Sequence, residues 1–410
     1  MKILLSAFAC QPNRGSEHGL GWNWVRALSR DHSVWVLTDQ LNAPAISAAG
    51  EIPNVRFEFV ACPLQRLRTR PVLAWIWRYL WQYAAYRRAV QLHREIRFDI
   101  VHHVTVGTWR LPSLLSRLDA PFIWGPVGGG QDIPRGFRGT LGVVGRRLEL
   151  ARSISQLMSR HDPLIRDTLT RATVVIAANT PTRKVLESMG RHDVRQILET
   201  AIEPAALRLP TQPRAGRPLH VFWVGEFHPR KALPLLLEAV QILQDRVALA
   251  VTVVGEGRER QRWERISRRL GVSGHVTFLG RVPHREVLSL YADADVFVFT
   301  SIRDTSGNVL LEAMAAGVPV VTLAWAGAPE IVSPDCGILI PPSSPEQVVR
   351  DLAAALERLA ADPDLRQRLG EAAQRRIRKL FTWERLTERM NALYREIRSA
   401  SQTGAGDTAP

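Results

Sequence analysis

The stretch SIRDTSGNVLLEAMAAGVPVV, residues 301–321, indicates the fold of this chain more clearly than any other segment. It follows the apolar run VFVFTS at residues 296–301, which has the composition of a buried strand. A turn at residues 305–308 leads into apolar residues at helical spacing, and the next apolar run begins at Pro319. A strand, a turn, a helix and another strand in so short a stretch indicate a βαβ unit of a parallel sheet.

The turn in this unit has the chemistry of an anion site. Gly307 lets the backbone approach a ligand, and the N–H groups at the helix start, at Ser306, Gly307 and Asn308, favour a phosphate. Asp304 and Glu312 flank the turn. Carboxylates beside a phosphate site are suited to holding the hydroxyls of a sugar or a ribose.

The same alternation of apolar runs and helical patterns continues through the chain and predicts two doubly wound α/β domains. Ligands of such sheets bind beyond the carboxyl ends of the strands, so two facing domains would form a site in the cleft between them. The strands of the first series are expected at residues 2–8, 34–38, 55–61, 100–104, 121–125, 173–178 and 194–198. Those of the second are expected at residues 220–225, 248–255, 276–280, 296–301, 319–323 and 337–340.

The domain boundaries follow from these series. The first domain covers residues 1–203, a Pro- and Arg-rich linker covers 204–218, and the second domain covers 219–380. A helix at 381–399 is expected to pack back on the first domain, and the tail 400–410 is expected to be disordered.

The amino-acid composition excludes several classes of protein. The 410 residues are 46% apolar, with 28 Gly and 26 Pro, which excludes a fibre or a disordered chain. Three distant cysteines form neither a disulfide framework nor a zinc motif, and no apolar run approaches the roughly 18 residues of a spanning helix. The net charge of +15 favours an anionic partner: nucleic acid, anionic lipid or a phosphorylated substrate.

Residues 301–321 resemble the hallmark of the retaining glycosyltransferases of family 4, also called group 1, which have the GT-B fold. That hallmark is a Glu, seven residues and a second Glu, in a helix close to LEAMAAGxPVV; here Asp304 takes the first place and Glu312 the second. The resemblance implies an α/β fold of two Rossmann-like domains facing a central cleft. It places Asp304 beside the donor sugar, as a catalytic residue, and Glu312 on the nucleotide ribose.

Three further segments of the second domain resemble the same family. In VGEFHPRKALPLLLEAV, residues 224–240, Arg230 and Lys231 would hold the donor diphosphate together with the turn at Ser306 to Asn308. Glu226 stands where the family usually has an arginine. AGAPEIV at residues 326–332 resembles a glycine-rich turn near the donor. In VTFLGRVPHREV the resemblance assigns the nucleobase to Gly280, Arg281 and Val282.

The first domain carries two glycine-rich loops. NRGSEHGLGWNWVRAL, residues 13–28, resembles the family loop that approaches donor and acceptor. It implies diphosphate contact at Gly15 and acceptor contact at Ser16 and Glu17. The loop in FIWGPVGGGQDIP is expected on the acceptor side at Gly128 and Gly129, with a simple flexible loop as the alternative.

The segment DIVHHVTVGTW, residues 99–109, resembles the family pattern DVVHxH, whose histidine is a catalytic-site residue. Counted from Asp99, His102 takes the first histidine position, whereas the second falls on Val104 and not on His103. Successive strand residues point to opposite faces, so only one of the two histidines can face the cleft. Both are candidates, and a buried structural role is expected for at least one.

Residues 64–97 form a basic and aromatic segment with eight arginines and one acid. Trp77, Leu80, Trp81 and Ala84 would share one helical face. Such a helix can lie in the interface of an anionic membrane, or it can be an ordinary helix whose aromatic face packs on the sheet. The two interpretations stay open at this point.

The sequence therefore predicts a retaining, metal-independent transferase. It would use a nucleotide diphosphate sugar, with no cofactor, and a saccharide or lipid-linked acceptor in polysaccharide assembly. We expect it in the cytoplasm, free or at the inner membrane surface, without a nucleic-acid partner. The alternatives are a non-catalytic GT-B protein that binds a membrane or a partner, and a nucleic-acid-binding protein, for which no module pattern is present.

Overall fold

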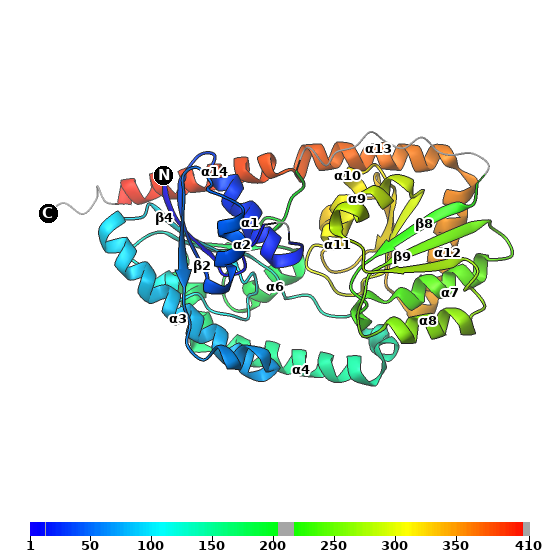
Figure 1. The fold of residues 1–410 in the computed structure, drawn as a ribbon, viewed down its shortest axis with the longest axis horizontal. Coiled ribbons are helices and arrows are strands. Elements are labelled where there is room, and N and C mark those ends of the chain that lie inside the picture. The colour runs from blue at the N-terminus through cyan, green and yellow to red at the C-terminus, as the bar shows by residue number, and fades with distance from the viewer. Residues whose placement is uncertain (13, 204–216, 405–410) are drawn as a thin grey trace. The chain divides into compact units, whose positions relative to one another are not determined.

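The computed structural model describes residues 1–12, 14–203 and 217–404. Nearly all of the expected linker 204–218 lies outside the described residues. The chain divides into two compact units: unit 1 is Met1–Gly130, Ser153–Glu199 and Glu384–Pro410, and unit 2 is Gln131–Arg152 and Thr200–Trp383. Each unit is built on one parallel sheet, and Figure 1 labels many of the helices and several of the strands.

Over the described residues, the sheet of unit 1 has seven strands in the order β3-β2-β1-β4-β5-β6-β7. The order reverses between β1 and β4, as in doubly wound folds that bind ligands at that point. Apolar runs such as KILLSA and SVWVLTD form the central strands because both faces of a parallel sheet are covered. The strands are β1 (Lys2–Ala7), β2 (Ser33–Asp39), β3 (Val55–Val60), β4 (Ile100–Thr105), β5 (Phe122–Val127), β6 (Val174–Ala177) and β7 (Arg195–Gln196).

The helices of unit 1 surround this sheet and bury one continuous core. Local caps set several of their starts: the side chain of Asn179, for example, accepts a hydrogen bond from the Thr182 N–H at the start of α6. The helices are α1 (Ser16–Leu28), α2 (Ala43–Ala48), α3 (Pro71–Ile96), α5 (Pro163–Arg171), α6 (Thr180–Ser188) and α14 (Trp383–Gly404), of which all but Trp383 lies in unit 1.

The aromatic face of α3 packs into this core. Trp77 and Trp81 are buried, and the Phe8 ring meets both indoles edge to face, with centroids 5.9 and 4.9 Å away. Leu80 and Ala84 pack against the same cluster. Of the two interpretations of residues 64–97, the structure therefore favours the ordinary helix for this face, because buried indoles cannot enter a membrane.

Unit 2 repeats the same strand order on a six-stranded sheet, β10-β9-β8-β11-β12-β13. The strands are β8 (Leu219–Val224), β9 (Leu249–Val254), β10 (Val276–Gly280), β11 (Val296–Phe299), β12 (Val320–Leu323) and β13 (Gly337–Ile340). In both units every expected strand is present, with its ends within two residues of the expected position. The fold class predicted from the sequence is thus confirmed.

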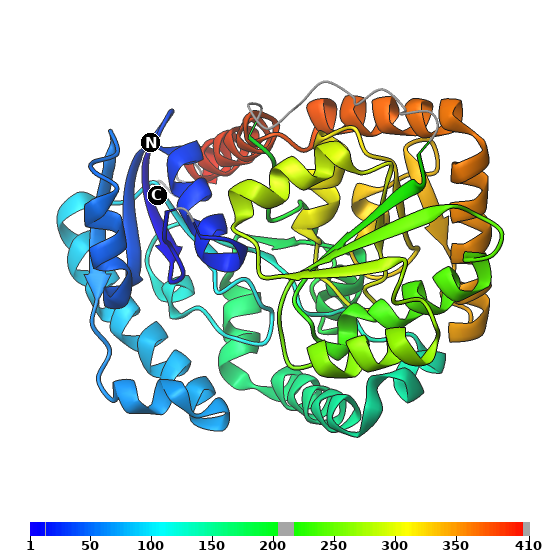
Figure 2. The same ribbon diagram turned by 45° about the vertical axis from the view of Figure 1, so that its right-hand side comes forward.

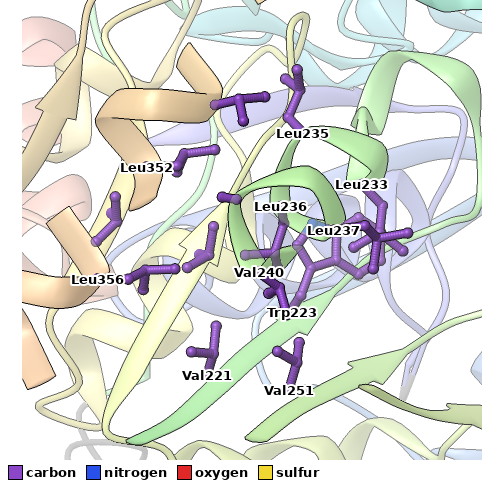
Figure 3. Close-up of a cluster of buried hydrophobic side chains, with 14 of the residues drawn as sticks. Val221, Trp223, Leu233, Leu235, Leu236, Leu237, Val240, Val251, Leu352 and Leu356 are labelled. Atoms are coloured by element: carbon purple, nitrogen blue, oxygen red, sulfur yellow. The ribbon is translucent and has the colours of Figure 1, made fainter. Parts of the chain in front are cut away.

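Helices cover both faces of the second sheet (Figure 2). The core packs α7 and α12 together through leucines, with Trp223 of β8 beside them (Figure 3). The helices are α7 (Leu233–Leu243), α8 (Arg260–Arg269), α9 (His284–Asp293), α10 (Asn308–Ala315), α11 (Ala328–Ile331), α12 (Pro345–Ala361) and α13 (Pro363–Leu380).

Two segments differ from the expected boundaries. Residues 131–152, assigned to the first domain by sequence, cluster with unit 2, so that α4 (Gly142–His161) starts in unit 2 and ends in unit 1. Helix α14 continues to Gly404, into the tail expected to be disordered. Among the described residues, none of the helices has the length and apolar character needed to span a bilayer.

Candidate functional site

The predicted donor residues lie at the carboxyl edge of the second sheet. β8 and β11 are neighbours where the strand order reverses, and the loops after them carry residues 225–231 and 300–307. Ligands of doubly wound sheets bind at this switch point, because neighbouring loops there lead to opposite faces of the sheet and leave a crevice. The sequence placed its two strongest motifs in these two loops.

Asp304 joins the two motifs. Its Oδ2 accepts a hydrogen bond from Lys231 Nζ at 2.5 Å, and its Oδ1 accepts one from Arg230 Nη1 at 2.9 Å. Arg230 also donates to the Arg303 carbonyl at 3.2 Å. Both predicted diphosphate-binding cations are therefore held by the predicted sugar-side carboxylate.

Burial and the neighbouring charges shift the pKa values of this cluster in opposite directions. Burial by itself would raise the pKa of Asp304, but Lys231 and Arg230 hold that pKa below its ordinary value, so the carboxylate is ionised. Burial lowers the pKa of Lys231, and Asp304 counteracts this effect. The ion pairs keep positive charge in a partly dehydrated position where it acts strongly on an anion.

The backbone fixes the positions of these cations. The Lys231 carbonyl accepts a hydrogen bond from Thr300 Oγ1 at 2.7 Å, and the Arg230 carbonyl accepts one from the Ile302 N–H at 2.9 Å. The ammonium of Lys231 lies 5.0 Å from the centre of the Phe299 ring. The site is thus preorganised by the end of β11.

Several charged residues near the Asp304 cluster were not predicted from the sequence. Arg303 forms an ion pair with Glu149, which comes from α4 and carries no motif. His228 contacts Arg258 at 2.7 Å; burial first, and then the surrounding cations, lower the pKa of His228 to about 4. Arg258 lies in the segment VVGEGRE, residues 253–259, and the spacing of the sequence does not connect it with His228.

Helix α10 begins beside this cluster. Gly307, in the left-handed conformation at φ +76°, precedes Asn308 and has no side chain with which to cap the helix start. The backbone of Gly327 packs on the turn: a Cβ there would lie 1.7 Å from the Thr305 carbonyl oxygen.

Because of this close approach, we expect Gly327→Ala to be destabilising. The added methyl group must push the Thr305 carbonyl away, which we expect to lower the free energy of unfolding of unit 2 by about 1–3 kcal/mol and to weaken nucleotide binding. Gly274→Ala is the matched control, since a Cβ at Gly274 meets no atom within 4 Å. Urea unfolding and nucleotide titration of both variants check this, and equal behaviour of the two would contradict it.

Glu312 occupies a second cluster on α10. It accepts hydrogen bonds from His284 Nε2 at 2.9 Å and from the buried Tyr291 hydroxyl at 3.1 Å. The hydrogen bond to Glu312 raises the pKa of His284. His284 follows the loop of Gly280, Arg281 and Val282, where Gly280 has φ +75°, so the predicted ribose and nucleobase residues are brought together.

In unit 1 the adjacent histidines of β4 have different surroundings. His102 Nε2 lies 2.6 Å from the Gly125 carbonyl oxygen, and Nδ1 lies 2.7 Å from the Tyr394 hydroxyl. A carbonyl only accepts, so Nε2 carries the proton and Nδ1 accepts from Tyr394. Both ring nitrogens of neutral His102 are thus hydrogen-bonded. This is the buried structural role expected for at least one of the two histidines.

His103 has one ring nitrogen available. Its Nε2 lies 3.2 Å from the Val106 carbonyl oxygen, and its buried Nδ1 has no hydrogen-bond partner among the described residues. His103 therefore presents a lone pair beside the loop that follows β4. Of the two candidates, only His103 has a ring nitrogen that could contact a substrate. Its role in a catalytic site stays a prediction.

Both histidines are expected to stay neutral between pH 5.5 and 8. Burial lowers the pKa of His102 to about 3 and that of His103 to about 4. The unfolded chain binds these protons near pH 6.5, so stability falls as pH drops below that value, by up to about 1.4 kcal/mol per pH unit for each group. NMR titration of labelled histidines, assigned with His102→Gln, checks this; a midpoint near 6.5 for either would refute it.

Three other predicted residues of unit 1, Glu17, Gly128 and Gly129, lie against the same loop. Glu17 Oε1 accepts from the Gly107 N–H at 2.8 Å, and burial raises the pKa of this carboxyl. The Gly128 N–H donates to the Gly107 carbonyl at 2.9 Å, and a Cβ at Gly129 would lie 3.0 Å from the Thr108 side chain. Gly15 precedes α1, which begins at Ser16.

Two arginines near this loop were missed by the sequence analysis as site residues. The guanidinium groups of Arg78 and Arg110 each lie 5.4 Å from the centre of the Trp75 ring. Arg78 also interacts electrostatically with Glu17. They come from distant segments, and no local spacing connects them.

Comparison with known proteins relates this chain to glycosyltransferases. Residues 210–376 match the family model of glycosyl transferases group 1. The chain is 35% identical over 191 residues to a D-inositol 3-phosphate glycosyltransferase of Corynebacterium jeikeium, which covers 44% of each chain. It is 30% identical over 228 residues to the lipopolysaccharide core biosynthesis glycosyltransferase LpsE of Rhizobium meliloti, covering 53% of this chain and 63% of that protein.

The matched curated relatives are covered over only about half of their length. Solved structures match more fully. Sucrose-phosphate synthase of Thermosynechococcus elongatus has a TM-score of 0.66 at 19% identity, over 97% of this chain and 99% of that one. HepE of Anabaena, solved with UDP, has a TM-score of 0.67 at 17% identity, over 97% and 100%. The chain therefore has the GT-B fold, and its group 1 match supports a glycosyltransferase.

Proposed function

We propose that this chain is a retaining glycosyltransferase of family 4. It transfers a sugar from a nucleotide diphosphate sugar to a hydroxyl of a saccharide or lipid-linked saccharide, in the assembly of a cell-surface polysaccharide, inside the cell or at the inner face of its membrane. The observation that carries the proposal is the cluster of Asp304, Arg230 and Lys231 beside the start of α10. It combines the family match with a charge pattern suited to a leaving diphosphate.

The cations supply the first part of the chemistry. Breaking the bond between sugar and diphosphate places negative charge on the departing phosphate oxygen. Lys231, Arg230 and the N–H groups of Ser306 to Asn308 would stabilise that charge, and the two cations are in place before the reaction begins. Fixed cations of this kind support the proposal that no metal ion and no cofactor is required.

The carboxylates supply the second part. Asp304 keeps both cations in position, and its remaining lone pairs can accept hydrogen bonds from sugar hydroxyls. Glu312, held by His284 and Tyr291, offers two oxygens to the vicinal hydroxyls of a ribose. The acceptor is assigned to unit 1, at Glu17, His103 and the loop that follows β4.

The test is turnover of nucleotide sugars by the full chain. UDP-, GDP-, ADP-, CDP- and dTDP-sugars are incubated with a panel of saccharide acceptors in EDTA, and released nucleoside diphosphate is measured. We expect release from one nucleotide class, lost in Glu312→Ala and kept in Glu286→Ala, an exposed carboxylate on α9. NMR of the product then compares the anomeric configuration with that of the donor; inversion would overturn retention. Nucleotide binding without any release would favour the non-catalytic alternative.

A further inference from the structure

Helix α4 exposes an unusual amount of apolar surface. Fourteen large hydrophobic side chains of the described residues are exposed, and seven of them belong to this one helix, at 44–69% exposure. They are Val143, Val144, Leu148, Leu150, Ile154, Leu157 and Met158. A contiguous exposed apolar surface on a soluble protein marks an interaction site.

The helix is oriented with its polar face inward. Glu149 pairs with Arg303, and Arg152 Nη2 donates to the Gln131 carbonyl at 2.8 Å. About two turns beyond Glu149 and one turn beyond Arg152, the same side of the helix continues with Gln156, which donates to the Gly129 carbonyl at 3.3 Å. An ordinary surface helix buries its apolar side; this helix is fixed by polar contacts and presents the opposite side to the surroundings.

Helical geometry explains why the apolar and the polar side chains of α4 lie on opposite faces. Val143, Leu150, Ile154 and Leu157 recur at intervals of three, four and seven residues, which places them on one face. Gly145, whose Cβ position lies 2.8 Å from the Leu141 side chain, is on the other face with Glu149. No described residue covers the apolar face, since the side chains on it are exposed.

The charge of α4 indicates which kind of surface can bind its apolar face. The exposed charged residues of α4 are Arg146, Arg147 and Arg160, and the one acid of the helix, Glu149, is engaged with Arg303. Within a chain of net charge +15, a second copy would bring two basic helices together. An anionic surface that accepts apolar side chains satisfies both properties, and an anionic lipid bilayer is such a surface.

We propose that α4 lies in the surface of an anionic lipid bilayer, with Leu150, Ile154, Leu157 and Met158 buried below the headgroups and the arginines on lipid phosphates. This surface is distinct from the aromatic face of α3, which is buried in the core of unit 1. The proposal does not depend on the transferase activity, because it rests on the exposed side chains and charges of α4 alone.

Vesicle sedimentation of the full chain tests the proposal. Wild type is expected to bind vesicles containing phosphatidylglycerol and to bind pure phosphatidylcholine vesicles far more weakly. Leu157→Glu with Met158→Glu should lower the partition coefficient by at least about tenfold, because it removes buried apolar area and adds negative charge. Leu41→Glu with Ile242→Glu is the matched control at two exposed apolar sites elsewhere, and it should bind as wild type does.

Three results would overturn the proposal. The first is equal vesicle binding by the α4 variant and its control. The second is loss of binding in Ile76→Glu with Tyr83→Glu, which alters the exposed side of α3, while the α4 variant still binds. The third is a wild-type dimer in light scattering that the α4 variant converts to a monomer, since a second copy would then cover the face. Circular dichroism confirms that each variant is folded.

Discussion

Turnover of the accepted nucleotide sugar is expected to fall by about 10²–10³-fold when Lys231 is replaced by alanine. The ammonium lies in a fixed, buried position, held 2.5 Å from Asp304 Oδ2 and above the Phe299 ring. Its loss removes positive charge where the diphosphate departs. It also leaves Asp304 with one cation instead of two, so the carboxylate repels the bound diphosphate more strongly.

Lys379→Ala is the matched control, because it removes a lysine from an exposed position on α13. Rates are measured at saturating donor, and the thermal midpoint of each variant separates a loss of catalysis from a loss of folding. Turnover of Lys231→Ala within about twofold of wild type would remove Lys231 from the proposed mechanism.

The second large effect concerns stability. Trp223→Ala is expected to lower the free energy of unfolding of unit 2 by about 3–5 kcal/mol. Trp223 is 1% exposed, meets the Trp263 ring edge to face at 5.8 Å, and donates its Nε1 hydrogen to Thr300 Oγ1 at 3.1 Å. Alanine would leave a cavity in the core and a buried hydroxyl without that donor.

Trp223→Phe keeps most of the volume and loses only the N–H group, so it should cost much less than the alanine variant. Urea unfolding followed by far-ultraviolet circular dichroism compares the two with wild type, since the removed indole would alter fluorescence by itself. If alanine and phenylalanine cost the same, the hydrogen bond to Thr300 would matter more than packing, contrary to this account.

The strands could be predicted because their signals are local. Each apolar run is short and is followed by a helical pattern, and a sheet covered on both faces requires little else from its strands. The donor motifs are equally local: Arg230 and Lys231 lie in one loop, and Asp304 to Asn308 lie in another. That Asp304 binds both cations follows from the neighbouring positions of β8 and β11 in the sheet.

The missed features depend on tertiary contacts. Glu149 and Arg303 are separated by 154 residues, and no spacing in the sequence connects them. The aromatic face of α3 has the same composition whether it faces a bilayer or the core, and only packing against Phe8 decides between them. The pattern of α4 is amphipathic in either orientation, so its spacing does not indicate that the apolar side points outward.

Calorimetric titration of the full chain with UDP, GDP, ADP, CDP and dTDP in EDTA tests the central claim most directly. We expect that one of these nucleotides binds at a single site and stabilises the folded chain, and that Lys231→Ala and Glu312→Ala each weaken this binding strongly. Binding of none of the five nucleotides, or binding that both variants leave unchanged, would contradict a donor site at the carboxyl edge of the second sheet.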